Sequence, residues 1–297
     1  MRVGLLVNAA AGRGRAAGVV DAVTARLADV ELTPLLAPDR ASAEALVART
    51  APGLDAVLAL GGDGVAHAAV QGLAGSCVPL GVLPAGTGND LALALGVPPD
   101  PVAAARAAVD DLARGAVTRL DLARTGDRWW ATVLCCGFDS VVSDRVNRLR
   151  WPRGPRRYDL AIAVELARLR PRAVRLVLDG VATSHEVTLV AVGNTPCYGG
   201  GLRICPTADP SDGLLDVTVI GPVTRLDLVR TRPRLAAGTH VEHPAVSVHR
   251  ARTVRVEGAG PSAAALTTWA DGEPVGGLPA ETVVVPGALA VVGADRR

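Results

Sequence analysis

The chain has 297 residues, 49% of them hydrophobic and only 2% aromatic, so it is long enough for two domains with cores of Ala, Val and Leu. The formal net charge of +2 gives no reason to expect nucleic acid as a partner. The absence of lysine excludes a P-loop, so phosphate must be held by backbone N–H groups, arginine or a metal ion. No apolar run reaches the ~18 residues that span a bilayer, so we expect a cytoplasmic protein that meets a membrane only peripherally.

The first part of the chain alternates between strand and helix patterns. Strands are predicted at 3–8, 31–37, 55–60 and 78–83, and helices at 17–27, 41–50, 65–74 and from Leu91 onward. This βαβα order favours an α/β domain with a doubly wound, mostly parallel sheet and ligands at the carboxyl ends of the strands. We assign residues 1–117 to this domain, and a final strand near 286–297 returns to it.

Beyond about residue 117 the sequence changes to short strand patterns separated by turn signals. Strands are predicted at 117–123, 129–136, 173–179, 185–192, 214–220, 246–248, 253–257 and 282–285, with one helix at 157–169. This part predicts a β-rich, sandwich-like second domain over residues 118–285.

The strongest local signal is a strand that ends in Gly61 and Gly62 and is followed by Asp63 and Gly64 at the start of a helix. Glycine lets the backbone approach phosphate oxygens closely, and a helix N-terminus adds N–H donors and a favourable dipole. A carboxylate would repel phosphate, so we expect Asp63 to engage a magnesium ion or to help organise the reacting hydroxyl. The alternative is a glycine turn in which Asp63 caps the helix.

A second glycine loop follows the next strand. Gly86 and Gly88 enclose Thr87, which together with Asn89 offers side-chain donors, and Asp90 is placed to cap the following helix. This loop alone could be a turn and a cap. Two such loops at the ends of neighbouring strands indicate a phosphate site.

A third glycine loop, residues 8–15, follows the first strand. The stretch from Gly12 to Ala17 fits G-x-G-x-x-A, but in the dinucleotide fingerprint the glycines lie directly at the strand end, whereas residues 8–11 intervene here. We therefore favour a nucleotide-phosphate loop with Arg13 or Arg15 nearby.

The order of these three loops resembles the catalytic domain shared by bacterial diacylglycerol kinases, related bacterial lipid kinases and sphingosine kinases. The resemblance continues through CGFD at 136–139, NTPCYGGGLRICPTADPSDGLLDV at 194–217 and ADGEP at 270–274. It covers nearly the whole chain, whereas GGDG alone also occurs in NAD kinases and phosphofructokinases. The resemblance implies that the first domain has the fold found in NAD kinases and phosphofructokinases.

The resemblance also implies site residues. ATP would bind along Asn8 to Arg13, along Gly61 to Ala68 and along Gly86 to Asp90. Thr87 would contact the nucleotide, and His67 is similar to the histidine of sphingosine kinases.

A magnesium site is implied in the DPSDGLL segment, with Asp212 as carboxylate ligand and Asp209 and Leu214 contributing through carbonyls. Glu273 matches the family's general base, with Asp271 close by, and a placed carboxylate can take the proton of a lipid alcohol. Without the resemblance, both segments read as turns.

Several positions depart from the family pattern. Ala9 and Ala11 stand where members commonly have Pro and Ser in the first loop. Ala37 stands where members have Thr, and Val65 and Ala68 stand in a stretch that often reads Thr-x-Asn-Glu. These changes remove side-chain ligands and leave the backbone loop in place. They keep open the alternative of a non-catalytic nucleotide- or lipid-binding protein.

Residues 144–158 combine six arginines with Trp151 and Tyr158, which indicates either a solvated basic loop or a docking segment for anionic lipid. We expect an ATP- and Mg²⁺-dependent lipid kinase at a membrane surface, with diacylglycerol as the first choice of acceptor. Sphingoid bases, other lipids and a soluble acceptor, as in NAD kinases, stay open. Whether the protein forms a homodimer also stays open.

Overall fold

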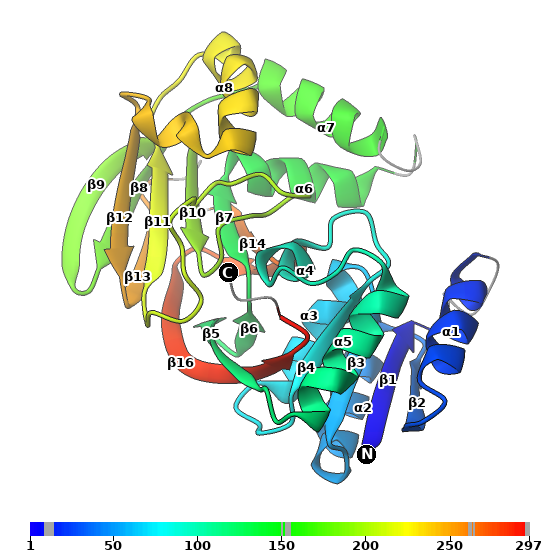
Figure 1. The fold of residues 1–297 in the computed structure, drawn as a ribbon. Coiled ribbons are helices and arrows are strands. Elements are labelled where there is room, and N and C mark those ends of the chain that lie inside the picture. The colour runs from blue at the N-terminus through cyan, green and yellow to red at the C-terminus, as the bar shows by residue number, and fades with distance from the viewer. Residues whose placement is uncertain (9–14, 150, 152–155, 261–262, 264, 295–297) are drawn as a thin grey trace.

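The computed structural model describes residues 1–8, 15–149, 151, 156–260, 263 and 265–294, and Figure 1 shows two regions of different texture. The first region alternates strands and helices. Its elements are β1 (Arg2–Asn8), α1 (Arg15–Arg26), β2 (Glu31–Ala37), α2 (Arg40–Thr50), a 3₁₀ turn (Ala51–Gly53), β3 (Ala56–Gly61), α3 (Asp63–Leu73), β4 (Leu80–Pro84), α4 (Asp90–Ala94) and α5 (Pro101–Ala113).

The strands of this region run parallel in the order β2-β1-β3-β4. Successive residues of β3 face opposite sides of the sheet: Leu58 packs in a core with α1 and α5, and Ala59 packs in a second core with α2 and α3. Helices thus cover both faces, which is why these strands are nearly continuous apolar runs. The predicted doubly wound parallel sheet is confirmed.

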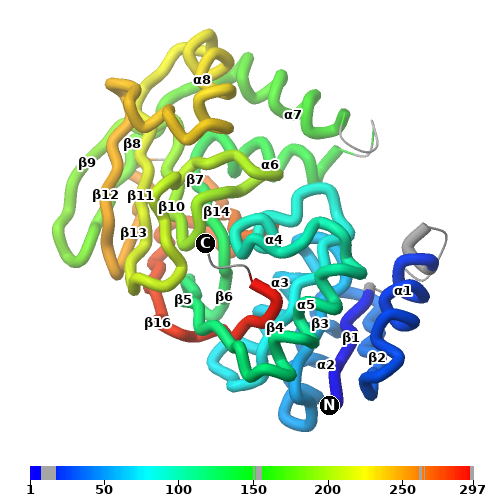
Figure 2. The backbone as a smooth tube through the Cα atoms, in the orientation of Figure 1, coloured from blue at the N-terminus to red at the C-terminus, as the bar shows by residue number. Residues whose placement is uncertain are grey.

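The second region is rich in antiparallel strands and lies beside the first (Figure 2). Its elements are β5 (Thr118–Thr125), β6 (Arg128–Trp130), β7 (Val133–Gly137), α6 (Phe138–Arg148), α7 (Arg156–Ala167), β8 (Arg172–Leu178), β9 (Val181–Val187), β10 (Leu189–Gly193), β11 (Leu215–Ile220), α8 (Arg225–Ala237), a 3₁₀ turn (Thr239–Glu242), β12 (Val246–Ala251), β13 (Thr253–Gly258), β14 (Thr267–Ala270), β15 (Glu273–Gly277) and β16 (Ala280–Val292).

Six of these strands form an antiparallel sheet in the order β12-β11-β10-β7-β14-β15. It shares a buried apolar core with β8 and β13, which belong to the ten-stranded sheet that also contains the parallel strands. Val174 and Val254 from that sheet meet Val190 and Val217 from the six-stranded one. The predicted sandwich-like second region is confirmed.

Strand β16 connects the two regions. Its first half pairs with β13, and its end pairs in parallel with β4 through Val291 opposite Leu80 and Val292 opposite Gly81. In Figure 1 this is the long red strand that sweeps from one region into the other. This pairing ties the end of β16 to the strand that precedes the second glycine loop.

Several predictions in the second region need correction. Helices α6 and α8 accompany α7, where only one helix was expected, and strands β14 and β15 were not expected. The stretch 129–136, expected as one strand, is divided between β6 and β7, which lie in different sheets. The stretch 185–192 is likewise divided between β9 and β10 in different sheets. The physical reason is visible in the burial: most of β9 is exposed, whereas every residue of β10 is buried. Within residues 185–192 the chain passes from β9, at the edge of one sheet, to β10, inside the other sheet. The sequence pattern therefore predicts one strand where the structure has two.

Candidate active site

The first and second glycine loops, residues 61–64 and 86–90, lie against each other at the carboxyl ends of β3 and β4. A Cβ placed on Gly86 would lie 2.5 Å from the Cα of Gly62, and one placed on Gly88 would lie 2.4 Å from Oδ2 of Asp63. No other residue type fits at Gly86 or Gly88 without displacing its neighbour, so glycine is required here by close approach. The structure thus brings residues 61–64 and 86–90 together.

Asp63 holds this arrangement. Its Oδ2 accepts a hydrogen bond from the Asn89 N–H at 3.0 Å, and its Oδ1 accepts one from the Asp90 N–H at 2.7 Å. Both carboxylate oxygens therefore cap the start of α4, a neighbouring helix, and Asp63 begins its own helix after the N-cap Gly62. The geometry gives Asp63 a positioning role, and its expected contact with magnesium stays a prediction.

The second loop is closed on itself by Asn89. This residue adopts a left-handed conformation (φ 57°), which asparagine tolerates better than most residues. Its side chain accepts from the Gly86 N–H at 3.0 Å and donates to the Gly86 carbonyl at 2.9 Å. Thr87 is exposed at the tip of this loop. The loop is thus preformed, and the predicted contact of Thr87 with the nucleotide stays a prediction.

Asp90 differs from the expectation that it caps its own helix. Its Oδ1 accepts from the N–H groups of Gly200 (2.8 Å) and Gly201 (3.1 Å), which belong to the second region. Burial, and then the nearby charge of Asp63, raise the pKa of Asp90, although these backbone hydrogen bonds oppose the shift. Asp90 therefore joins the glycine loops to the other half of the molecule.

Strand β1, which precedes the third glycine loop, lies between β2 and β3 and runs parallel to both, so its last residue, Asn8, lies at the same edge of the sheet. Gly12 and Arg13 lie outside the described residues, as does the side chain of Asn8. Their predicted contacts with ATP stay predictions.

A cleft of about 350 Å³ opens beside these loops. Gly62, Gly64 and Glu273 line it, and its other lining residues are Leu6, Val7, Ala37, Asp39, Arg40, Ala43, Val65 and Ala68. The size falls in the range of small-molecule sites, about 300–1,000 Å³. Three positions that depart from the family pattern, Ala37, Val65 and Ala68, line this cleft, so these substitutions make that part of its wall apolar. Ala9 and Ala11, which also depart from the pattern, lie outside the described residues.

Glu273 reaches this cleft through the hairpin of β14 and β15. Two successive residues of the turn, Asp271 (φ 51°) and Gly272 (φ 79°), have positive φ, which is the geometry of a tight hairpin turn. A Cβ on Gly64 would lie 3.9 Å from Oε1 of Glu273. The hairpin therefore brings the predicted base beside the glycine loop, although Gly64 and Glu273 are 209 positions apart in the chain.

Asp271 is buried and fully engaged. It accepts from the N–H groups of Ala131 and Thr132 (2.9 Å each), from the Thr132 hydroxyl (2.5 Å) and from Nδ1 of His67 (3.1 Å). Burial raises the pKa of Asp271, but the His67 contact and the other hydrogen bonds outweigh it, so the pKa lies below the ordinary value. With no free oxygen, Asp271 is placed to anchor the hairpin.

His67 links this anchor to the first region. An ionised carboxylate can only accept a hydrogen bond, so the Asp271 contact assigns a proton to Nδ1 and leaves Nε2 as an acceptor. Nε2 lies 3.2 Å from Nη2 of Arg128, whose guanidinium binds both oxygens of Glu44 at 2.8 and 2.9 Å. His67 thus supports the hairpin through Asp271. Its predicted contact with the nucleotide stays a prediction.

Arg40 was not predicted. It begins α2 directly after the Asp39 N-cap, and its guanidinium forms an ion pair with Glu273. Its position beyond the end of β2 was a usable signal, because residues that follow parallel strands gather at one edge of the sheet. Arg128 and Thr132 were also missed, since nothing local marks them as neighbours of Asp271.

The predicted magnesium residues form a separate cluster. Oδ1 of Asp212 accepts from the Leu214 N–H at 2.9 Å, and its other oxygen pairs with Arg250, which also contacts Asp216 at 3.2 Å. Oδ1 of Asp209 accepts from the N–H and the hydroxyl of Ser211.

These residues, as they are arranged, do not fit a metal ion, because Arg250 already supplies the positive charge beside Asp212. No group of three or more possible ligand side chains occurs in the described part of the chain. No hydrogen bond or ion pair among described residues joins Asp209 or Asp212 to Asp63 or Glu273. The magnesium role of Asp209, Asp212 and Leu214 stays a prediction, and no chemical step is assigned to it.

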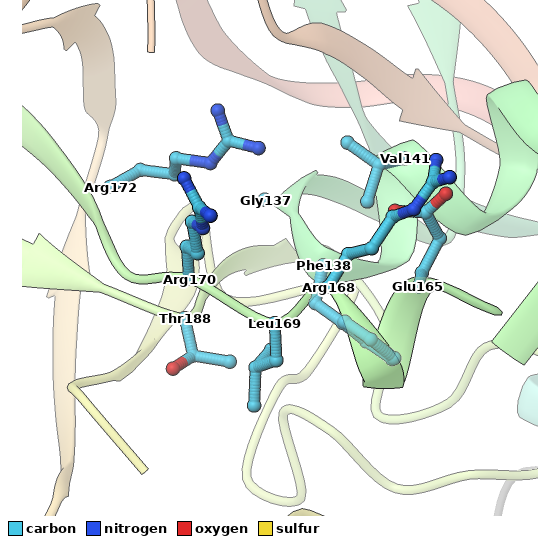
Figure 3. Close-up of a pocket in the computed structure, with 9 residues that line it drawn as sticks. All are labelled: Gly137, Phe138, Val141, Glu165, Arg168, Leu169, Arg170, Arg172 and Thr188. Carbon is cyan, nitrogen blue, oxygen red and sulfur yellow. The ribbon is translucent and has the colours of Figure 1, made fainter. Parts of the chain in front are cut away.

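A second, much smaller pocket lies between α6, the end of α7 and β8 (Figure 3). Gly137, Phe138, Arg168, Arg170 and Thr188 are among the residues that line it, and its volume is about 20 Å³. That space suits about one water molecule, which could meet the buried Thr188 hydroxyl that has no partner among described residues. The pocket is too small for a nucleotide.

Comparisons with known proteins agree with this geometry. The family described as "Diacylglycerol kinase catalytic domain" matches residues 2–125, and the one described as "YegS C-terminal NAD kinase beta sandwich-like domain" matches residues 132–293. A diacylglycerol kinase of Mycobacterium tuberculosis is 45% identical over 98% of this chain and 94% of its own length. A diacylglycerol kinase of Bacillus subtilis is 28% identical over 77% of this chain and 74% of its own.

The fold has solved counterparts. The crystal structure of a diacylglycerol kinase from Bacillus anthracis superposes with a TM-score of 0.73 at 20% identity, covering 98% of this chain and 96% of that one. Another solved structure from that organism reaches a TM-score of 0.81 at 23% identity. The sequence matches thus confirm the resemblance, and the chain belongs to the diacylglycerol kinase family of lipid kinase enzymes.

Proposed function

We propose that this lipid kinase transfers the γ-phosphoryl group of ATP, which enters as its Mg²⁺ complex, to the hydroxyl group of diacylglycerol. The proposal is supported by the position of Glu273, whose carboxylate lines the same cleft as Gly62 and Gly64. This is the observation that carries it, because a base must lie within reach of the hydroxyl that attacks the phosphate.

In this proposal the glycine loops hold the phosphates. The absence of side chains at Gly62 and Gly86 lets their backbones approach closely, and the preformed second loop avoids an ordering cost when ATP binds. The apolar wall that contains Ala37, Val65 and Ala68 suits the adenosine portion.

Glu273 would accept the proton of the attacking hydroxyl as the new P–O bond forms and the bond to the ADP oxygen breaks. Mg²⁺ bound to the nucleotide would neutralise charge on the transferring group, as in other phosphoryl transfers. Asp63 and Asp271 do not react: they hold the loops and the hairpin at the required separation.

The acceptor is tested with radiolabelled γ-phosphate transfer. Diacylglycerol, a sphingoid base, ceramide and phosphatidylglycerol are presented in separate vesicles of otherwise equal composition, with NAD as a soluble acceptor. We expect label in the diacylglycerol fraction, in the form of phosphatidic acid. Label that appears only in another lipid would replace the proposed acceptor, and label in NAD would overturn the lipid assignment of this site.

We further propose that the enzyme meets its acceptor at the surface of an anionic membrane. Trp151 (78% exposed) and Tyr158 (55% exposed) project near the start of α7. Helix α8 has no buried residue, exposes Leu226 and Val229, and carries four arginines against one aspartate. Arginine next to exposed apolar side chains suits an anionic interface.

No helix in the described residues has the length and apolar character to cross a bilayer. Sedimentation with vesicles tests the peripheral contact: we expect binding to vesicles with phosphatidylglycerol, weaker binding at high salt, and little binding to phosphatidylcholine alone. Equal binding to both vesicle types would contradict the proposal.

A further inference from the structure

Arg40 occupies a position in the cleft that the proposed mechanism does not yet use. Among the described residues that line the cleft it is the one cation, and the chain contains no lysine that could take this role. Its backbone is fixed at the first turn of α2, because the Asp39 side chain caps that helix by accepting from the Ser42 N–H at 2.8 Å. The guanidinium extends from there to Glu273.

We propose that Arg40 is a phosphate-binding residue of the cleft, and that it exchanges its partner Glu273 for the terminal phosphates of ATP when the nucleotide binds. The inference rests on the proposed ATP-dependent function and adds to it a specific residue and a consequence for the base.

The exchange is physically reasonable because the ion pair is open to solvent. The Arg40 side chain is 39% exposed and that of Glu273 is 22% exposed, and such pairs contribute little net stability. A triphosphate offers more negative charge than one carboxylate, and arginine can bind phosphate oxygens with two parallel N–H groups. The nucleotide would therefore compete successfully for the guanidinium.

One other carboxylate, that of Glu44, attracts Arg40, but its oxygens are already engaged by another arginine. Glu44, one helical turn further along α2, is bound through both oxygens to Arg128. Asp39 uses its side chain for the helix cap. Glu273 is thus the one described ion-pair partner of Arg40.

The exchange has a consequence for catalysis. While Arg40 is paired with Glu273, the carboxylate is neutralised and less able to accept a proton. When ATP takes the guanidinium, Glu273 is released beside the γ-phosphate, where the hydroxyl must be deprotonated. The base would become available only with nucleotide in place.

Calorimetric titrations of ATP and AMP test the proposal on wild type, Arg40→Gln, Glu273→Gln and the double variant. We expect Arg40→Gln to weaken ATP binding roughly tenfold to a hundredfold, as for one lost charge-assisted contact, and to leave AMP binding within about twofold. Glu273→Gln should tighten ATP binding by about threefold to tenfold, because Arg40 is then free. The double variant should bind ATP with the same affinity as Arg40→Gln.

Arg175→Gln serves as the matched control, because Arg175 is also a part-exposed arginine paired with one glutamate, Glu257, and lies outside the cleft. It should bind ATP like wild type, and thermal melts should show all variants folded. Equal ATP affinity of wild type and Arg40→Gln would overturn the assignment of Arg40. Tighter binding by Glu273→Gln that persists in the double variant would overturn the exchange. If the wild-type protein binds no ATP, the proposed nucleotide function itself is refuted. This outcome differs from the two above, in which the wild-type protein does bind ATP.

Discussion

The two sides of the cleft are held in different ways. On the loop side, the carboxylates of Asp63 and Asp90 accept from backbone N–H groups, so their partners cannot leave without moving the chain. On the hairpin side, Glu273 pairs with the end of a long, part-exposed arginine. The comparison separates Asp63 and Asp90, which hold the shape of the site, from Glu273, which can change its partner in the proposed reaction.

The hairpin itself contains both types, which makes it the sharpest place to test this distinction. Asp271 and Glu273 lie two positions apart, yet the first is buried with four donors and the second faces the cleft. If the distinction is right, removing the charge of Glu273 should affect the rate and removing that of Asp271 should affect stability.

The largest effect is expected for Glu273→Gln. We expect kcat to fall by about 10²- to 10⁴-fold, the usual contribution of a general base, with the melting temperature unchanged. Steady-state kinetics on vesicle-presented diacylglycerol and a thermal melt give both values. Glu281→Gln is the control, since Glu281 is an exposed glutamate also paired with an arginine, Arg255. A Glu273→Gln enzyme with near wild-type kcat would remove Glu273 as the base.

Asp271→Asn should act chiefly on stability. Replacing a buried, hydrogen-bonded carboxylate leaves N–H donors facing the new amide, at a cost of about 3 kcal/mol in the free energy of unfolding. Because the pKa of Asp271 is lowered, its contribution is present above the ordinary value of 3.8 and is lost as the pH falls through the folded-state pKa. The difference between wild type and variant should therefore shrink in acid.

Denaturant titrations at about pH 7 and about pH 3.5 measure both effects of Asp271→Asn. Asp179→Asn is a close control: Asp179 also has positive φ (46°) and accepts from Arg252 and Thr253 at a strand connection, but it is exposed. Water can replace its lost bonds, so we expect a loss under about 1 kcal/mol. Equal losses at Asp271 and Asp179 would break the argument from burial.

Asp63→Asn should have a moderate effect on both properties. The amide keeps one acceptor and turns an N–H group toward a backbone donor, which costs about 1–2 kcal/mol and loosens the loops, with ATP affinity lowered about tenfold. Asp55→Asn tests the opposite end of the same strand, where Asp55 accepts from the Arg2 N–H at 2.7 Å. The control should lose stability without losing ATP affinity, and lost affinity there would show that the effect is general.

The smallest effect is expected for Asp90→Asn. The pKa of Asp90 is raised, so its charged form is disfavoured in the folded protein, and this penalty disappears as the pH falls through the folded-state pKa. Asparagine keeps the oxygen that Gly200 and Gly201 need and removes the repulsion from Asp63, so the free energy of unfolding near pH 7 should change by less than about 1 kcal/mol. A much larger loss would show that the charge of Asp90 is required to join the two regions.

Much of this site could be predicted because its parts are local. The strands predicted at 55–60 and 78–83 are apolar runs, and the glycine loops at 61–64 and 86–90 follow them. Parallel order then places both loops at one edge of the sheet. The same local reasoning failed at residues 185–192, where one apolar pattern is shared by two sheets, and at α8, which buries no residue and so leaves no core-facing stripe.

The sequence by itself determined the alternating first region and the glycine loops, and through its resemblance it predicted Glu273 as a site residue. The tertiary structure alone decided which groups meet: Asp63 with the start of α4, Arg40 with Glu273, and His67 with Asp271 across 204 positions. The physical reason is that strand and turn preferences act between near neighbours in the chain, whereas the partner of a carboxylate depends on which distant segment folding brings beside it.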